Sequence, residues 1–212
     1  MNFYYRCGWL FFRTFLQIYL RWRSFNAERV PQTGAVILAS NHASILDPPA
    51  VGCALHRQIN YLARATLFDI PGVGWLFRKW TAIPIDRDGG NAAGLRIILG
   101  RLEAGNGIIL FPEGTRTRDG NLQPARSGIG LIVAKSTAPV VPVRTFGTFE
   151  AMGRNQKFPL PKKVAVKFGR PMNFEKLRAE AKQCDKTRLK EIYQEIADEI
   201  MAEIAKLEPK TD

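Results

Sequence analysis

A histidine and an aspartate five residues apart are the first candidates for chemistry in this chain. His42 and Asp47 follow directly after the apolar run Ala35–Ser40. A carboxylate that reaches the imidazole would fix its tautomer and stabilise its protonated form, leaving the second ring nitrogen to take a proton. The alternative is two helix caps, with Asn41 and His42 at one helix start and Asp47 at another, and the spacing alone does not exclude it.

A second chemically capable segment is the polar loop Pro112–Ala125, which follows the apolar run Gly107–Phe111. Gly114 permits a close backbone approach, and Arg116 can bind a phosphate or carboxylate with two donors. Glu113 can orient Arg116 or a substrate hydroxyl. The alternative interpretation of these residues is a plain turn with solvated charges.

Two further arginines end apolar runs in the same way. Arg64 closes the run Asn60–Arg64, and Arg87 follows the run Thr81–Asp86. Because α/β sheets build their sites at the carboxyl ends of strands, these arginines are expected to lie near His42. Several strand ends that each offer a polar group are more specific than any one of these motifs.

The elements that must position these residues alternate between strand and helix patterns. This alternation predicts one layered α/β domain with a largely parallel central sheet flanked by helices. The expected strands are Ala35–Ser40, Asn60–Arg64, Thr81–Asp86, Gly107–Phe111, Val140–Phe146 and Val164–Phe168. The expected helices begin at Asp47, cover Asn91–Ala104 and Ser127–Ser136, and end in an amphipathic helix with Leu189, Ile192, Ile196, Ile200 and Ile204 on one face.

The amino terminus, Met1–Trp22, is dense in Phe, Tyr, Trp and Leu. Arg6 and Arg13 interrupt the apolar run, which argues against the roughly 20 apolar residues of a spanning helix. Aromatic rings mixed with arginines suit the boundary of a bilayer, so residues 1–23 are interpreted as an interfacial anchoring helix and residues 24–212 as the catalytic domain. The alternatives are an ordinary helix packed on the core and, less favoured, a spanning helix.

The charge of the chain is strongly positive. Its 212 residues include 31 Lys and Arg against 19 Asp and Glu, a net charge of +12. The excess lies in residues 1–172, which hold 23 basic and 9 acidic side chains. Such a field attracts nucleic acid, anionic phospholipid or phosphorylated small substrates. Arg154–Arg170 holds six basic and no acidic residues, typical of a solvated basic face, and no nucleic-acid-binding motif is visible.

Other site classes find little support in the sequence. Two histidines far apart and three cysteines without paired spacing predict neither a metal site nor a disulfide framework. Ser40 and Ser44 lack the Gly-x-Ser-x-Gly elbow of serine hydrolases, and no glycine-rich nucleotide loop is present. The sequence therefore predicts an enzyme without a cofactor.

Taken together, the segments resemble the glycerolipid acyltransferase superfamily, and within it the 1-acylglycerol-3-phosphate O-acyltransferase family, which makes phosphatidic acid from lysophosphatidic acid. The resemblance covers residues 36–143, with four blocks in the family's order. These blocks are Asn41-His42-x4-Asp47, Ile83–Arg87, Phe111–Thr117 and Val140–Val143. The first and third blocks, at this separation and with the second between them, are the specific part of the match.

The resemblance implies a role for each site residue. His42 would act as general base on the free hydroxyl of a lysophospholipid and Asp47 would orient its ring, with acyl-CoA or acyl carrier protein as donor. Substrate contacts would come from the second and third blocks and the arginines beside them. The implied substrate-binding residues are Arg64, Arg87, Glu113, Gly114, Thr115, Arg116 and Arg126. The family often has lysine where Arg64 falls and near Arg126, which changes the donor geometry at these two positions.

The resemblance also implies a peripheral enzyme on the cytoplasmic face of an anionic membrane. Three alternatives stay open: an acyltransferase for a different lysophospholipid, a lipid esterase that uses water as acceptor, and a non-catalytic basic module that binds nucleic acid. The esterase predicts thioester cleavage without an acceptor. The nucleic-acid module leaves the aromatic amino terminus and the His-Asp pair unexplained, so no nucleic-acid partner is expected.

Overall fold

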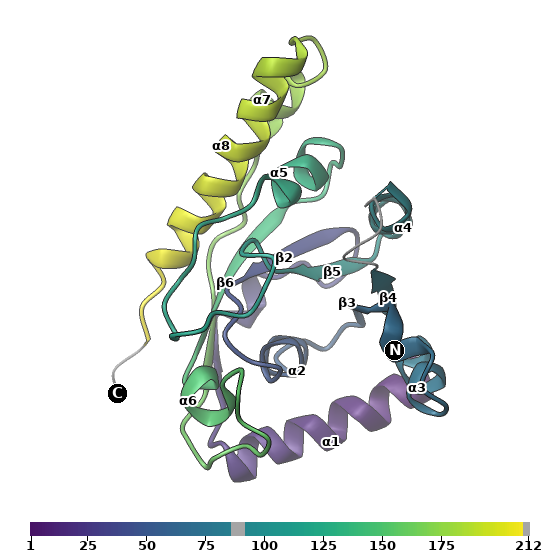
Figure 1. Cartoon of the computed structure of the whole chain (residues 1–212), viewed down its shortest axis with the longest axis vertical. Coiled ribbons are helices and arrows are strands. Elements are labelled where there is room, and N and C mark those ends of the chain that lie inside the picture. Colours follow the sequence, from purple (N-terminus) through teal and green to yellow (C-terminus); the bar gives the residue numbers. More distant parts are fainter. Residues whose placement is uncertain (86–91, 210–212) are drawn as a thin grey trace.

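The computed structural model describes residues 1–85 and 92–209, and within them a seven-stranded sheet forms the centre (Figure 1). The strands are β1 (Arg23–Phe25), β2 (Val36–Ser40), β3 (Ile59–Arg64), β4 (Ala82–Ile85), β5 (Gly107–Leu110), β6 (Val140–Phe146) and β7 (Ala165–Phe168). Their order is β1-β7-β6-β2-β5-β3-β4, and each neighbouring pair is parallel except β6 with β7. The predicted α/β domain with a largely parallel sheet is confirmed.

Helices cover both faces of this sheet. The α-helices are α1 (Phe3–Tyr19), α2 (Asp47–Gly52), α3 (Val73–Lys79), α4 (Ala92–Glu103), α5 (Ser127–Ala134), α6 (Thr148–Met152), α7 (Glu175–Glu180) and α8 (Lys186–Ala205). Two short 3₁₀ helices, η1 (Ala27–Arg29) and η2 (Ala65–Phe68), complete the described elements. Figure 1 shows α1 and α2 on one side of the sheet and α5 and α8 on the other.

The two faces of the central strands build two separate cores. Every residue of β2 is buried, and alternate residues point to opposite sides, as the strand pleat requires. Leu38 packs in the cluster that includes α1 and α2, whereas Ile37 packs in the cluster that includes α5 and α8. Burial on both faces explains why these strands read as continuous apolar runs in the sequence.

The strand predictions agree with the structure within about a residue, and so does the last helix. Ile192, Ile196, Ile200 and Ile204 are all fully buried in α8. The sequence patterns did not predict the short edge strand β1 or the helices α6 and α7. Each is too short to carry a clear apolar period, and β1 opens on a charged residue.

Helix α1 has one buried and one exposed side. Its buried residues are Tyr5, Gly8 and Leu16. The indole Nε1–H of Trp9 donates to the carbonyl of Leu55 at 3.0 Å, and Nη1 of Arg13 donates to the carbonyl of Cys53 at 2.6 Å. The side that faces away from the domain also carries large apolar side chains among polar ones, with Phe3, Leu10, Phe11 and Ile18 exposed to between 61% and 77%.

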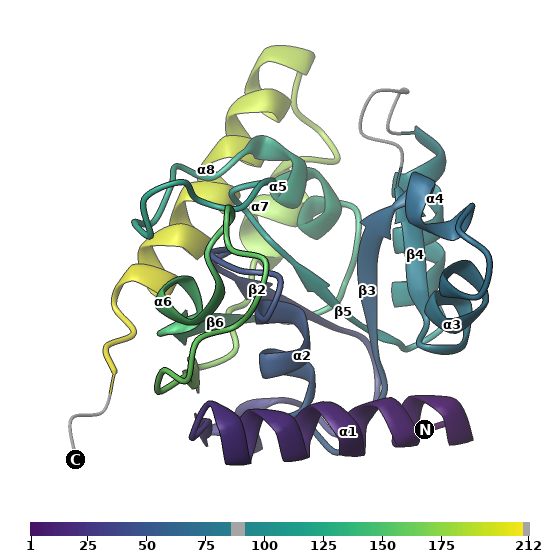
Figure 2. The ribbon, with the colours of Figure 1, turned by 60° about the horizontal axis from the view of Figure 1, so that its bottom comes forward.

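One side of α1 therefore packs on the core, as one of the interpretations expected. The opposite side exposes the apolar residues on which the anchor prediction depends. Figure 2 shows α1 lying across one end of the molecule, below α2. Within the described residues, no helix has both the length and the apolarity that crossing a bilayer requires.

Candidate active site

The candidate residues gather where neighbouring parallel strands end. Strands β6, β2, β5 and β3 are consecutive in the sheet and all run in the same direction. The segment with His42 follows β2, the loop with Arg116 follows β5, and Arg64 is the last residue of β3. The expectation that these strand ends meet at one edge is confirmed.

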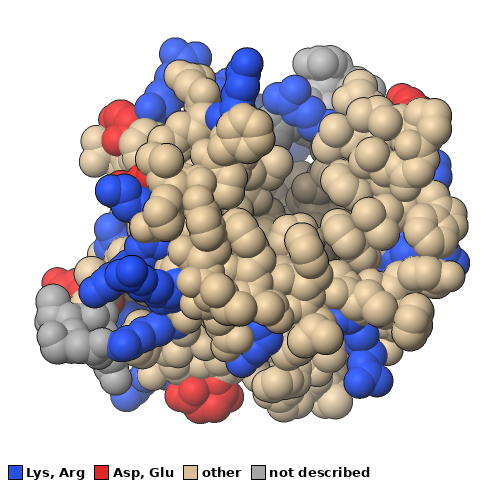
Figure 3. All heavy atoms as spheres, turned by 90° about the horizontal axis from the view of Figure 1, so that it is seen from below, with Lys and Arg blue, Asp and Glu red and all other residues tan. Residues whose placement is uncertain are grey.

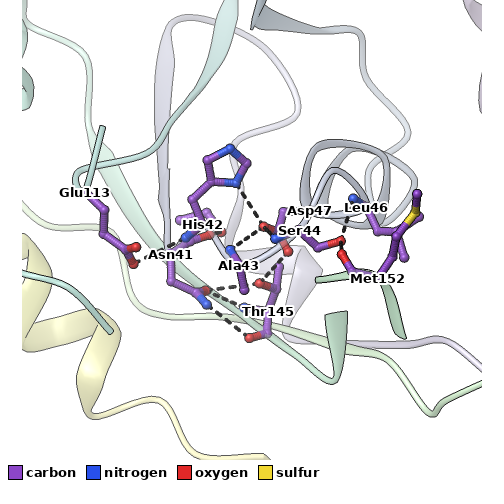
Figure 4. Close-up of polar contacts among 10 residues, drawn as sticks. Asn41, His42, Ala43, Ser44, Leu46, Asp47, Glu113, Thr145 and Met152 are labelled. Carbon is purple, nitrogen blue, oxygen red and sulfur yellow. Dashed lines mark hydrogen bonds and ion pairs between the residues drawn. The ribbon is translucent and has the colours of Figure 1, made fainter. Parts of the chain in front are cut away.

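His42 and Asp47 form the predicted pair. The Nδ1 atom of His42 lies 3.0 Å from Oδ2 of Asp47, and the aspartate is fully buried (Figure 4). The same Oδ2 accepts hydrogen bonds from the backbone N–H groups of Ala43 and Ser44, both at 2.7 Å. The turn between the two residues therefore wraps around the carboxylate, and the aspartate is a partner of the imidazole rather than only a helix cap.

A second layer of hydrogen bonds fixes the aspartate from strand β6. The Thr145 hydroxyl lies 3.0 Å from Oδ1 of Asp47 and 3.2 Å from Oδ1 of Asn41. That asparagine oxygen already accepts the backbone N–H of Thr145 at 2.8 Å. The Thr145 hydroxyl has one proton, and we assign its hydrogen bond to the carboxylate of Asp47, which is the stronger acceptor.

The imidazole is held on its flat side as well as at Nδ1. Phe111 stacks on the His42 ring with 3.8 Å between the ring centroids and 16° between the planes. Because Nδ1 faces Asp47, Nε2 lies on the other edge of the ring, and His42 is among the residues that line the main cavity. The nitrogen available for proton transfer is thus on the ring edge away from the carboxylate.

Glu113 lies behind this pair rather than in the cavity. It is almost fully buried, and its Oε1 accepts the backbone N–H of His42 at 3.3 Å. The pKa of Glu113 is raised to about 7, chiefly by burial and in part by the charge of Asp47, and the hydrogen bonds from the backbone of His42 and Gln123 offset only part of this rise. The sequence interpretation expected a contact with Arg116 or substrate. Within the described part of the chain, the carboxyl instead supports the backbone that carries the histidine.

The loop after β5 is joined to the histidine segment by one backbone hydrogen bond and closed on itself by another. Thr117 N–H donates to the carbonyl of His42 at 2.8 Å, and Arg126 N–H donates to the carbonyl of Pro112 at 2.9 Å. Gly114 has a φ of +71°, and a Cβ there would come within 3.0 Å of Cδ of Arg126. The glycine therefore lets the loop turn while the Arg126 side chain passes over it.

Three of the predicted arginines border one cavity. Arg64, Arg116 and Arg126 line it together with Gly114 and Thr115. Arg87 lies outside the described residues. Arg154, just after α6, lines the cavity too and was not predicted as a site residue. Its signal in the sequence was the acid-free basic segment that it opens. Within residues 1–85 and 92–209, none of these arginines forms an ion pair with a carboxylate.

The cavity itself is large and mostly apolar, with a volume of about 1150 Å³. Figure 3 shows a hollow on the face that carries α1, bordered mostly by uncharged surface, with Lys and Arg at its upper edge and along the margins of this face. The α1 residues Tyr5, Gly8, Trp9 and Phe12 line the cavity. Helix α1 is thus part of the wall of the site.

These features together define what the site can do. One imidazole nitrogen faces a cavity, a buried carboxylate orients the ring, and several arginines stand at the cavity wall. Most of the remaining lining is apolar. This combination suits removal of a proton from the hydroxyl of an amphiphile that has an anionic group and a hydrocarbon chain.

Comparison with known proteins gives a family for this arrangement. A sequence model of the Acyltransferase family matches residues 21–145 of the chain. The chain is 31% identical over 128 residues to the 1-acyl-sn-glycerol-3-phosphate acyltransferase BAT2 of Brassica napus, in an alignment that covers 59% of this chain and 37% of that protein. It is 29% identical over 119 residues to the 1-acyl-sn-glycerol-3-phosphate acyltransferase of Bacillus subtilis, with 56% of this chain and 59% of that protein covered.

The chain therefore spans between about a third and three fifths of the length of these curated relatives. Among solved structures, the crystal structure of the 1-acyl-sn-glycerophosphate acyltransferase from Thermotoga maritima superposes with a TM-score of 0.70 at 23% sequence identity. That match covers 97% of this chain and 83% of the other, so the fold is shared along almost the whole chain.

Proposed function

The chain belongs to the acyltransferase family, and we propose that it transfers a fatty acyl group from a thioester donor to the free hydroxyl of lysophosphatidic acid, which gives phosphatidic acid. One observation carries this proposal. His42, held by Asp47, borders an apolar cavity of about 1150 Å³ that Arg64, Arg116 and Arg126 also line.

In the proposed reaction, His42 acts as the general base. With its Nδ1–H donated to Asp47, the Nε2 lone pair accepts the proton of the acceptor hydroxyl. The hydroxyl oxygen attacks the thioester carbonyl carbon, the carbon–sulfur bond breaks, and the departing thiolate takes the proton from the imidazolium. Asp47 stays ionised and stabilises the imidazolium, which explains why a buried carboxylate with four hydrogen-bond donors around it is useful at this position.

The arginines are proposed to bind the phosphate of the acceptor. Guanidinium groups bind phosphate oxygens with paired donors, and an arginine without a carboxylate partner has its donors available. Arg116 and Arg126 come from the loop that also contacts the histidine segment, so phosphate binding and the base share one scaffold. Arg64 and Arg87 are proposed to complete this group, and Gly114 and Thr115 to offer the backbone that the phosphate approaches.

Residues 1–23 are proposed to attach the enzyme to one leaflet, with residues 24–212 as the catalytic domain. The support is the exposed apolar side of α1, whose other side lines the cavity. A helix that lies in the interface in this way lets a membrane lysophospholipid reach the site without leaving the lipid phase. The donor, acyl-CoA or acyl carrier protein, would then arrive from the aqueous side, on the cytoplasmic face.

The direct test is transfer by the purified protein in detergent, with acyl-CoA and lysophosphatidic acid, followed through thiol release and the product lipid. His42→Ala and Asp47→Asn should each lower turnover by about a hundredfold or more while the fold is kept. The matched control is His56→Ala, because His56 is exposed, contacts Trp9 and does not line the cavity. Full activity of His42→Ala would refute the mechanism, and thiol release that needs no acceptor would indicate an esterase.

A further inference from the structure

A second surface beside α1 has the chemistry of a lipid contact. The segment Gly153–Lys163, which we call the basic loop, connects α6 to β7. Phe158 is 80% exposed and Leu160 is 44% exposed. Large apolar side chains held in water near one another usually mark an interaction site. Phe158 is the most exposed of the large apolar side chains in the described residues.

The basic loop is held in place by hydrogen bonds. The backbone N–H of Leu160 donates to the carbonyl of Ala151 at 2.7 Å, and the N–H of Gly153 donates to Oε1 of Gln156 at 2.6 Å. Pro159 and Pro161 restrict the backbone on both sides of Leu160. The exposed Phe158 is therefore presented by an ordered segment, which lowers the entropy lost when a partner binds it.

The basic loop lies against the carboxyl end of α1. The hydroxyl of Tyr19, the last residue of α1, donates to the carbonyl of Pro159 at 3.0 Å. Figures 1 and 2 agree that the segment after α6 lies beside the carboxyl end of α1. Phe158 and Leu160 thus belong to the segment that contacts the carboxyl end of that helix, where Ile18 is 77% exposed.

The charged residues of the basic loop are all of one sign. Arg154, Lys157, Lys162 and Lys163 are exposed, and the basic loop contains no acidic residue. Lysines and arginines near an anionic bilayer surface each add to binding, and an aromatic ring among them sits well at the headgroup boundary. The basic residues of the loop therefore match the anionic headgroups of a bilayer, and its apolar residues match the boundary beneath them.

We propose that the basic loop is a second membrane-contact element, specific for anionic bilayers, that acts with α1 to set the orientation of the cavity mouth on the leaflet. Arg154, near the start of the loop, lines the cavity, so only a few residues separate the proposed membrane contact from the candidate active site. This inference rests on the proposed function, because binding through both α1 and the basic loop is useful to an enzyme whose acceptor lies in the bilayer. An acidic carrier protein is the competing occupant, and the contact of the loop with the end of α1 at which Ile18 is exposed favours the bilayer.

The test is flotation of the full chain with vesicles of phosphatidylcholine plus phosphatidylglycerol, and with vesicles of phosphatidylcholine alone. Phe158→Ser with Leu160→Ser should lower the partition coefficient by about tenfold on the mixed vesicles. Replacing Lys157, Lys162 and Lys163 by Gln should weaken binding to the mixed vesicles by roughly tenfold or more, with little change on phosphatidylcholine. The matched controls are Ile97→Ser on α4 and Lys190→Gln on α8, both exposed and away from α1, and they should bind as the wild type does.

Unchanged vesicle binding by the Phe158 and Leu160 variant would overturn the inference. A raised KM for an acyl carrier protein donor in that same variant, with vesicle binding intact, would assign the loop to a protein partner instead. Acyl transfer measured in detergent, where no vesicle is present, tests the proposed function separately from the role of the loop. The loop variants should keep the wild-type rate there, and a wild-type protein that transfers no acyl group would refute the function while the flotation result still decides the role of the loop.

Discussion

Asn41 and Thr145 exchange two hydrogen bonds across the end of strand β2. The backbone N–H of Thr145 donates to Oδ1 of Asn41 at 2.8 Å, and Nδ2 of Asn41 donates to the carbonyl of Thr145 at 3.3 Å. Strand β2 ends at Ser40 while its neighbour β6 continues to Phe146. The asparagine amide thus replaces the backbone pairing that β2 no longer supplies, which explains why an asparagine stands directly before the histidine.

The Thr145 hydroxyl gives the first prediction. Thr145→Val keeps the shape of the side chain but removes the donor to Asp47, and a hydrogen bond to a charged group contributes about 1.5–3 kcal/mol. We expect kcat to fall by roughly tenfold or more with KM for both substrates unchanged, because the residue positions the proposed base, His42, rather than the substrate. Steady-state kinetics measures this, and Thr145→Ser should restore the rate.

Thr148→Val is the matched control for this substitution. Thr148 is also fully buried, but its hydroxyl has no hydrogen-bond partner among the described residues. Its loss should leave kcat unchanged and keep or slightly raise the stability. Equal losses of kcat in the two valine variants would show that Thr145 acts only through packing.

The second prediction concerns Glu113, whose pKa burial raises from 4.5 to about 7. Between these two values the folded protein keeps a proton that the unfolded chain has released. The free energy of unfolding therefore falls as the pH rises through this interval and levels off above it. Glu113→Gln removes this dependence and resembles the protonated side chain. Relative to the wild type, the variant should gain up to about 3 kcal/mol between about pH 4.5 and pH 8.

Denaturant unfolding of both proteins across this pH range measures the difference. The hydrogen bond from the backbone of His42 should survive in Glu113→Gln, because the amide oxygen can accept it. Parallel pH profiles for the two proteins would mean that Glu113 titrates at its ordinary value in the folded state. Burial of the carboxyl would then not raise its pKa, and the two proteins would differ only by a constant free energy.

The third prediction separates backbone strain from a substrate contact at Gly114. Gly114→Ala places a Cβ at a φ of +71° and 3.0 Å from Cδ of Arg126, so this side chain must shift by a few tenths of an ångström. We expect a loss of about 1 kcal/mol in stability from the backbone, together with a several-fold rise in KM for lysophosphatidic acid. Gly34→Ala is the control, because its φ is +78° and a Cβ there meets nothing within 4 Å. It should lose similar stability with KM unchanged, and equal KM values in both variants would contradict a role for Arg126 in phosphate binding.

The fourth prediction uses two residues of α1 that lie on opposite sides. Leu16 is fully buried, so Leu16→Ala should lower the free energy of unfolding by about 2–5 kcal/mol. Ile18 is 77% exposed, so Ile18→Ala should change stability by less than about 0.5 kcal/mol and weaken binding to vesicles. Thermal unfolding and vesicle flotation measure the two effects. Vesicle binding that is unaffected by Ile18→Ala and by the same change at Phe11 would reject the anchor.

The sequence alone was enough for the features that depend on short stretches of chain. Short apolar runs predicted the strands β2, β3, β4, β5 and β6, alternation of apolar and polar residues predicted β7, and the spacing of isoleucines predicted α8. The His42–Asp47 spacing and the loop with Arg116 predicted the site, because α/β sheets place their functional groups where strands end. These patterns are local, so they can be read without knowing what packs against them.

The tertiary structure decided what depends on residues far apart in the chain. Thr145 reaches Asp47 across 98 residues, because β6 pairs with β2 and no local pattern encodes that pairing. The inward direction of Glu113 and the place of Arg154 at the cavity follow from loop paths that spacing does not fix. The amino terminus shows the same division: its composition predicted an interfacial helix, and only the packing revealed which side faces the domain and lines the cavity.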